Sequence, residues 1–216
     1  MRRAILVLLL LLINLTVFGI TIFYDNFDNR KNEWQQYGGK WQYSSDGFLL
    51  QRTADPRQIN CIFYVDNPQV ADATIETFVR VHPDLPEIIT NSAQDQTLLK
   101  NVRYIMGAGI IFRMKDRDNF YMFRLAGEEG AVLGKMVNGK WTDLANPRST
   151  DNLPGRVRFS GSNWYRLKVK VYDKRILCYI NDSAVVSYED NEFGLGHFGL
   201  CTFKARADFD YIRIYN

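Results

Sequence analysis

The chain has 216 residues, of which 46% are hydrophobic and 14% aromatic, enough to bury the core of one domain. Its formal net charge of +3 includes Arg2 and Arg3, and without these two residues it is +1. So small a charge lacks the electrostatic footprint of a nucleic-acid-binding protein, and we expect no nucleic-acid partner.

The amino-terminal segment has the pattern of an export signal. It reads MRRAILVLLLLLINLTVFGITIFYDNF, with a basic start, an apolar stretch, and Val17 and Gly19 as small residues suited to cleavage. We predict a signal peptide over 1–19 and one β-sandwich domain over 20–216, in a protein that is secreted or held in the periplasm or cell envelope. Because 4–24 contain no charge, an uncleaved membrane anchor is the alternative, and such a leader would be the only membrane contact.

After this segment, apolar residues recur with a period of two. ATIETFVRV (73–81) and WYRLKVKVYD (164–173) alternate apolar with polar residues, which is typical of strands with one buried face. Turn-forming pairs that favour tight hairpins separate the apolar runs, and these are Asp46-Gly47, Asn138-Gly139 and Asn181-Asp182. About a dozen short strands and no amphipathic helix predict an all-β fold, a two-sheet antiparallel jelly-roll sandwich.

One segment interrupts this rhythm. Residues 82–103 contain two prolines and a polar centre, and they are too long for a hairpin loop. We expect a binding loop or a short helix on the rim of the sandwich. His82 and His197 are the only histidines, and neither is accompanied by a nucleophile elbow. His197 precedes a Gly-Leu strand, and we expect a structural role for it.

The segment GAGIIFRMKDRDNFYMFRL (107–125) consists of two apolar runs around the polar tip KDRDN. If the two runs pair so that residue numbers sum to an odd value, as for Met114 with Tyr121, one face of the hairpin is apolar and aromatic. Arg113 and Arg124 then share the opposite face. An even register would place an arginine among aromatic rings on each face, where an unpaired charge costs several kcal/mol. The odd register is therefore predicted.

This register gives Arg113 and Arg124 a shared outward face. Guanidinium groups on such a surface can donate paired hydrogen bonds to the hydroxyl or carboxylate groups of a ligand. The alternative is that both arginines form ion pairs with acids on neighbouring strands, such as Glu76.

Other residues have two possible roles. Trp41 and Trp141 lie beside turn glycines, where an indole ring can stack on a sugar or cap the core. The three cysteines lie in apolar runs without metal-binding spacing. Cys178 and Cys201 could form a disulfide in an oxidising compartment, and buried free thiols are the alternative.

Three acids fall near the two ends of the predicted domain. Asp25, Asp28 and Asp210 could supply oxygen ligands for a structural calcium ion if the chain ends lie side by side. Solvated acids near strand ends explain them equally well. We expect no other cofactor.

Four motifs occur in a fixed order along the chain. They are a Gly-Ile-x-Phe-Arg strand (109–113), a Trp-Tyr-x-Leu strand (164–167), a Gly-x-x-Gly turn leading into Gly-Leu (196–200), and a closing Phe-Asp-x-Ile-x-Ile (209–214). In this order the chain resembles the concanavalin A-like lectin/glucanase superfamily, in the laminin G-like branch that includes the 3-keto-disaccharide hydrolase domains. The resemblance covers most of the predicted domain. It implies an extracytoplasmic jelly roll with ligands on a concave sheet or at loop rims.

The chain departs from the glucanases of this superfamily. Those enzymes carry a Glu-x-Asp-x-Glu pattern on one strand, whereas the strand ADFDYIRI supplies Asp208 and Asp210 without a glutamate. A retaining glycosidase needs two carboxyl groups about 5 Å apart, and the sequence shows no such pair.

We therefore expect an exported, lectin-like, non-catalytic module that binds a poly- or oligosaccharide. The predicted site is the face of Arg113 and Arg124, roofed by residues 83–102. One alternative is a glycoside hydrolase of the 3-keto-disaccharide hydrolase or glucanase-like type, with Glu76 or Glu128 as an acid in a cleft. Another is a structural envelope or adhesion protein.

Overall fold

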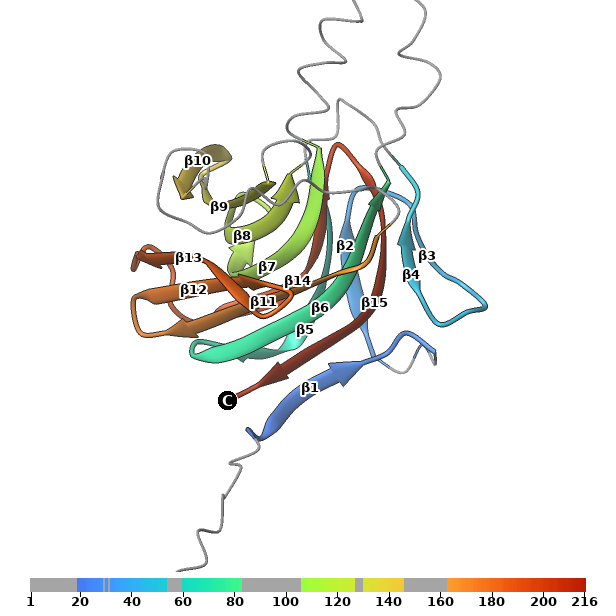
Figure 1. Ribbon diagram of the computed structural model, residues 1–216, viewed down its shortest axis with the longest axis horizontal. Helices are drawn as coiled ribbons and strands as arrows, with labels where there is room; N and C mark the ends of the chain where they lie inside the picture. Colours follow the sequence, from blue (N-terminus) through green and yellow to red (C-terminus); the bar gives the residue numbers. More distant parts are fainter. Residues whose placement is uncertain are drawn as a thin grey trace, which may run out of the picture.

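Two antiparallel sheets face each other in the computed structural model, which describes residues 19–28, 30, 32–53, 60–82, 106–126, 130–145 and 163–216. The eight-stranded sheet runs β13 (Ser183–Glu189), β12 (Arg175–Ile180), β11 (Tyr165–Tyr172), β6 (Ala73–His82), β15 (Arg206–Tyr215), β4 (Leu49–Gln51), β3 (Trp41–Tyr43), with β1 (Thr21–Asp25) paired to β15. The seven-stranded sheet runs β10 (Lys140–Ala145), β9 (Gly130–Val137), β8 (Asn119–Ala126), β7 (Gly107–Asp116), β14 (Gly196–Phe203), β5 (Asn60–Val70), β2 (Trp34–Tyr37). Figure 1 shows β6, β11 and β15 in the foreground, crossing the strands of the other sheet.

The predicted all-β sandwich is confirmed, and strand alternation explains its core. In β11, Leu167, Val169 and Val171 are buried between the sheets, while Lys168 and Lys170 point outward. The other strands contribute large rings and branched chains to the same core, among them Phe112, Phe123, Phe198 and Phe209. Each such side chain contributes about 1.5 to 3 kcal/mol on burial.

A second, smaller apolar cluster lies on the opposite side of the seven-stranded sheet. Successive strand residues point to opposite faces, so Ile110 packs into the inter-sheet core and Ile111 into this cluster. We call it the outer cluster, and its buried members are Ile62, Tyr64, Ile111, Met114, Phe120, Met122, Met136 and Cys201. The sandwich therefore has apolar material on both faces of one sheet.

The pairing of β7 with β8 has the predicted parity. Ile110 lies opposite Phe123, so the residue numbers of each pair sum to an odd value between Gly107 and Phe112. The partners themselves differ from the prediction by two residues, because Phe112 pairs with Tyr121. The register then shifts between Phe112 and Asp116 at a β-bulge.

The three cysteines are free thiols and all are buried. Cys178 lies on β12 and Cys201 on β14, in different sheets, so the disulfide alternative is wrong. Burial raises the pKa of the Cys178 thiol well above its ordinary value, which makes it unreactive.

The predicted leader, residues 1–19, lies outside the described residues except for Gly19. Within the described part of the chain, no helix has the length and hydropathy of a membrane-spanning segment.

A charged network closes one edge of the core. Lys135 donates a hydrogen bond of 2.8 Å to Asp190, and the Tyr121 hydroxyl donates another to the same carboxylate. Burial alone would raise the pKa of Asp190, but these donors outweigh it and the pKa is lowered.

We expect acid to weaken the fold through this aspartate. A lowered folded-state pKa stabilises the protein above the unfolded value of about 3.9, and this contribution is lost as pH falls through the folded-state pKa. Asp190→Asn should lower the free energy of unfolding at pH 7 by about 2 kcal/mol and flatten its fall below about pH 4. Urea denaturation from pH 7 to pH 2 measures both. Asp46→Asn, at an exposed aspartate, is the control. If the free energy of unfolding fell equally steeply with pH in both variants, the assignment to Asp190 would be contradicted.

Candidate functional site

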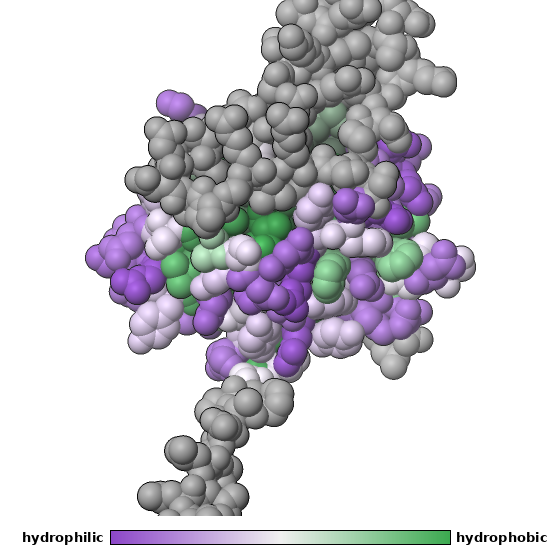
Figure 2. Space-filling model, viewed as in Figure 1, coloured by the Kyte–Doolittle hydropathy of each residue, from purple (hydrophilic) through white to green (hydrophobic). Residues whose placement is uncertain are grey.

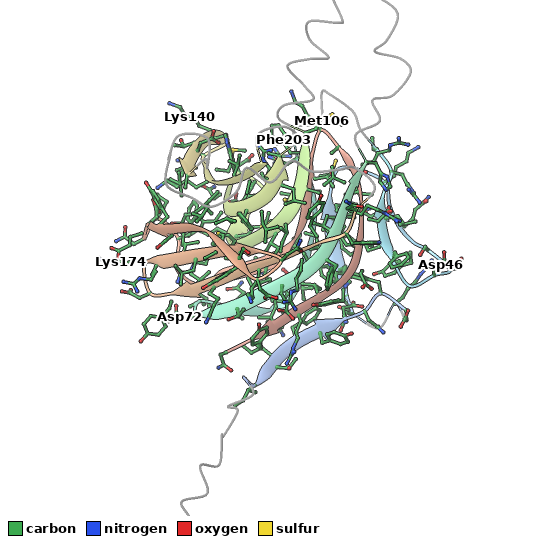
Figure 3. The ribbon with its side chains drawn as sticks, in the orientation of Figure 1. Asp46, Asp72, Met106, Lys140, Lys174 and Phe203 are labelled. Atoms are coloured by element: carbon green, nitrogen blue, oxygen red, sulfur yellow. The ribbon has the colours of Figure 1, made fainter. Side chains whose placement is uncertain are left out.

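Arg113 does not lie on the outward face predicted for it. Its guanidinium donates from Nε to the Ala71 carbonyl (3.0 Å), from Nη1 to the Phe193 carbonyl (3.1 Å), and from Nη2 to the Asp173 carbonyl (2.7 Å) and to Asp72 Oδ1 (3.1 Å). The residue is only 3% exposed. In Figure 3, the labelled Asp72 and Lys174 mark the two turns that meet at this end of the sandwich.

The bulge is the physical cause of this difference. Arg113 has a φ of +48°, which breaks the alternation, so Phe112 packs into the core and Met114 into the outer cluster. Arg113 is thereby directed to the rim between the sheets, where it binds the β11–β12 turn and the connections β5–β6 and β13–β14. The prediction that it shares a face with Arg124 is wrong.

Arg124 does point away from the inter-sheet core. Its guanidinium carbon lies 4.8 Å from the centre of the Phe203 ring, a cation–π arrangement beside the outer cluster. Glycine is required at the neighbouring position 107, because a Cβ there would lie 1.8 Å from the Leu125 carbonyl oxygen and 3.2 Å from Arg124 Nη1. Phe203 and the neighbouring Met106 mark this end of the sheet in Figure 3.

Glu76 lies on β6, in the other sheet, and pairs with neither arginine. Its carboxylate accepts hydrogen bonds of 3.2 Å from the hydroxyls of Tyr211 and Tyr215. Burial, followed by the charge of Glu76, raises the pKa of both tyrosines. The suggested ion pairs with Glu76 are therefore not formed, and Glu128 and the loop 83–102 lie outside the described residues.

The two tryptophans have different surroundings. Trp41 stacks on Phe63 at 5.0 Å and caps the edge of the inter-sheet core, as its alternative role required. Trp141 packs against Gly134 beside the outer cluster and donates from Nε1 to Asp143 at 2.6 Å. Only Trp141 stands on the same side of the sandwich as Arg124.

The predicted calcium ligands are not assembled. Asp25 accepts hydrogen bonds from the Phe27 amide (2.7 Å), Asn32 Nδ2 (2.7 Å) and Trp34 Nε1 (2.8 Å). The pKa of Asp210 is raised by burial and then by the charge of Asp28. Among the described residues, no group of three or more acidic, histidine or cysteine side chains could hold a metal ion.

A pocket of about 560 Å³ opens between an edge strand and two hairpin tips of the seven-stranded sheet. We call it the hairpin pocket. Its lining residues are Tyr37, Asp116, Arg117, Asp118, Asn119 and Asn138.

Hydrogen bonds between the two hairpins hold the polar wall of this pocket. Asp116 Oδ1 accepts from the Asp118 amide (2.8 Å) and from Asn119 Nδ2 (2.9 Å). Asn119 Oδ1 accepts from the Asn138 amide (2.9 Å), and the Gly139 amide donates to the Asp118 carbonyl (3.0 Å). The tips of β7–β8 and β9–β10 are thus fixed to each other.

The opposite wall is aromatic. Tyr37 is 38% exposed, and its ring stacks on Tyr64 with centroids 5.4 Å apart. Tyr64 in turn contacts the His197 ring and belongs to the outer cluster, and its burial raises its pKa to about 12. Tyr37 therefore presents one ring face on a supported aromatic stack.

Sequence reasoning did not identify these pocket residues. Two sequence features contain pocket residues, the polar tip KDRDN and the Asn138-Gly139 pair. From the sequence alone, both indicate only that the chain turns there. Tyr37 carried no distinguishing signal, because its approach to the tips depends on the curvature of the whole sheet.

No protein-family model matches the chain, and no curated protein matches it. Several solved structures have a similar fold. The carbohydrate-binding module CBM66 from Bacillus subtilis has a TM-score of 0.66 at 19% identity, over 86% of this chain and 96% of that one. A galectin-like protein of unknown function from Bacillus subtilis has a TM-score of 0.59 at 12% identity, over 91% and 96%. The β-glucanase of Bacillus licheniformis has a TM-score of 0.56 at 10% identity, over 93% and 99%.

At these identities the comparisons establish the fold. The chain is an all-β sandwich of the concanavalin A-like type, shared by binding modules and glucanases alike.

The hydrogen bonds of Arg113 predict that it is structural. Arg113→Met should lower the free energy of unfolding by about 3 kcal/mol, because it leaves buried carbonyl groups and Asp72 without their donors. Urea denaturation of residues 20–216 measures the change. Arg175→Met, at a side chain 63% exposed, is the matched control and should change it by less than about 0.5 kcal/mol. Equal free energies of unfolding for Arg113→Met and the wild type would contradict the structural role of Arg113.

Proposed function

We propose that this protein is an exported, non-catalytic carbohydrate-binding protein that holds a poly- or oligosaccharide in the hairpin pocket. Two lines support the proposal. Its fold is similar to that of a carbohydrate-binding module, and its amino-terminal segment has the pattern of an export signal. The proposal is carried by one observation, the meeting of an exposed tyrosine ring with amide, carboxylate and guanidinium groups in one pocket.

This combination suits a sugar. A pyranose ring has an apolar face that stacks on an aromatic side chain, and hydroxyl groups that exchange hydrogen bonds with planar polar groups. Tyr37 supplies the ring. Arg117 and Asn138, both exposed, supply donors and acceptors from the facing hairpin tips.

The pocket predicts weak binding. Three hydrogen bonds of about 1 kcal/mol each and one stacking contact of about 1 kcal/mol give roughly 4 kcal/mol, which corresponds to a dissociation constant on the order of 1 mM. Useful affinity then requires several contacts along one polymer.

The arrangement of the acids favours binding over hydrolysis. Asp116 and Asp118 come from one tight turn, and Asp116 accepts the hydrogen bonds that shape this turn. A glycosidase instead places two carboxyl groups on either side of the scissile bond. Likeness to a β-glucanase is a likeness of fold and supplies no such pair.

A glycan array on the mature domain tests the proposal. For neutral glycans that bind, Tyr37→Ala should weaken binding by about tenfold, because it removes the stacking surface and opens the wall of the pocket. Isothermal titration calorimetry with the best array ligand measures the change.

Tyr172→Ala is the matched control, because Tyr172 is also exposed but lies at the end of β11 in the other sheet. An array without any bound neutral glycan, or equal affinities for wild type and Tyr37→Ala, would refute the proposed site.

A further inference from the structure

The outer face of the eight-stranded sheet carries a concentration of positive charge. Because the inward residues of these strands are apolar, the alternate residues point to solvent, and many of them are cationic. Figure 2 shows hydrophilic residues spread over this side of the molecule. The cations that matter here are Arg52, Arg80, Arg166, Lys168, Lys170 and Arg213.

The carboxylates that lie among these cations neutralise only part of that charge. Glu76 and Asp208 are buried beneath the cations, and Asp182 forms ion pairs with Arg166 and Lys168. The six cations therefore outnumber the carboxylates that lie among them. Since the chain without Arg2 and Arg3 has a net charge of only +1, a large share of its excess positive charge lies on this face.

Asp208 organises the densest part of the face. It is 2% exposed, and its Oδ2 accepts from Arg80 Nε (3.0 Å), Arg80 Nη2 (2.7 Å) and His82 Nε2 (2.8 Å). The ring of Trp164 lies 4.7 Å from the Arg80 guanidinium carbon. Burial raises the pKa of Asp208, but His82 and Arg80 outweigh this and lower it, so the carboxylate stays ionised and holds Arg80 in place.

Arg52 is the loosely held cation of this cluster. Its Nη1 lies 3.6 Å from Asp208 Oδ1, beyond hydrogen-bonding distance, and its side chain is 43% exposed. It can therefore turn to an incoming anion at little cost, while Arg80 remains fixed beside it.

The cations continue in rows along β6. Lys168 and Arg213 lie on either side of Glu76, and Lys170 lies beside Thr74, about 6.7 Å further along the strand. From Thr74 to His82 the rows extend over roughly 27 Å. The pKa of Lys168 is lowered by burial and then by the charges of Arg166 and Lys170, a sign of like-charge crowding that a bound anion would relieve.

Aromatic rings accompany these charges. Trp164 underlies Arg80, and the exposed Tyr24 lies 6.1 Å from Tyr211 beside Arg213. Cations at regular intervals with rings between them match a polymer whose sugar rings stack and whose substituents are negatively charged.

We propose that the outer face of the eight-stranded sheet binds an acidic polysaccharide, a polyuronate or sulfated glycan, along β6 between Arg52 and Lys170. This inference goes beyond the proposed function and does not rest on it, because it concerns the opposite sheet and stands on the charge of that face. Carboxylate or sulfate groups pair with the guanidinium and ammonium groups, and a chain spanning several rows adds their weak contributions.

Polygalacturonate and dextran sulfate test the inference, with neutral dextran as the uncharged polymer, in biolayer interferometry on the mature domain. We expect the domain to bind at least one acidic polymer. The affinity for that polymer should fall at least tenfold between about 50 and 500 mM NaCl, because salt screens the charges. The double variant Arg52→Gln, Lys170→Gln removes two exposed cations and leaves the hydrogen bonds from Arg80 and His82 to Asp208 in place. It should weaken this binding by about tenfold.

The double variant Lys115→Gln, Lys140→Gln is the matched control, with the same change in net charge on exposed residues of the other sheet. It should bind like the wild type. Equal weakening in both double variants would overturn the site, and so would a failure to bind either acidic polymer. Stronger binding to phosphatidylserine-containing vesicles or to duplex DNA than to both acidic glycans would also overturn it. Tyr37→Ala should leave acidic-polymer binding unchanged, so failure of this inference is distinguishable from failure of the hairpin pocket.

Discussion

The apolar seam between the two sheets decides where each charged group of this protein can lie. A charge inside it without partners would cost several kcal/mol, so the sequence either alternates the charge outward or supplies partners for it. Arg113 shows the second solution. It reaches the rim of the seam, and three backbone carbonyls and Asp72 accept its donors. The same guanidinium thereby joins β7 of the seven-stranded sheet to the β11–β12 turn of the other sheet and to the two connections that pass between the sheets. A charge that would be costly if unpaired thus links the two layers.

The parts of the fold that depend on alternation were predictable from sequence. Period two in 164–173 gives the buried and exposed faces of β11, and an odd pairing parity gives the apolar face of the β7–β8 hairpin. Both follow from local chain geometry and from the free energy of burying apolar surface. The side of the sheet on which Arg124 lies follows from the same reasoning, and it is correct.

What sequence did not predict depends on contacts between distant segments. The bulge at Arg113 is stabilised by acceptors at Ala71, Asp173 and Phe193, and nothing within the hairpin itself indicates it. Glu76 was considered as a partner for the arginines because strand order cannot be read from alternation. The topology places β6 in the other sheet, where two tyrosine hydroxyls donate hydrogen bonds to the Glu76 carboxylate. The hairpin pocket was missed for the same reason, since it exists only where Tyr37 meets two hairpin tips.

The two outer faces are chemically unlike because only one of them carries a continuous apolar cluster. The seven-stranded sheet carries the outer cluster, so its accessible polar groups are confined to hairpin tips and edges. The outer side of the eight-stranded sheet has a few apolar residues, Leu50, Phe78 and Leu177, but they lie beside charged cross-strand partners, and rows of lysine and arginine run between them. Burying Glu76 and Asp208 beneath those rows limits the repulsion among the cations without removing their outward charge. A sandwich of this kind can present a stacking site among polar side chains and an ionic track to different parts of one polymer. The weak affinity of each is then an advantage, because neither contact alone would immobilise the protein.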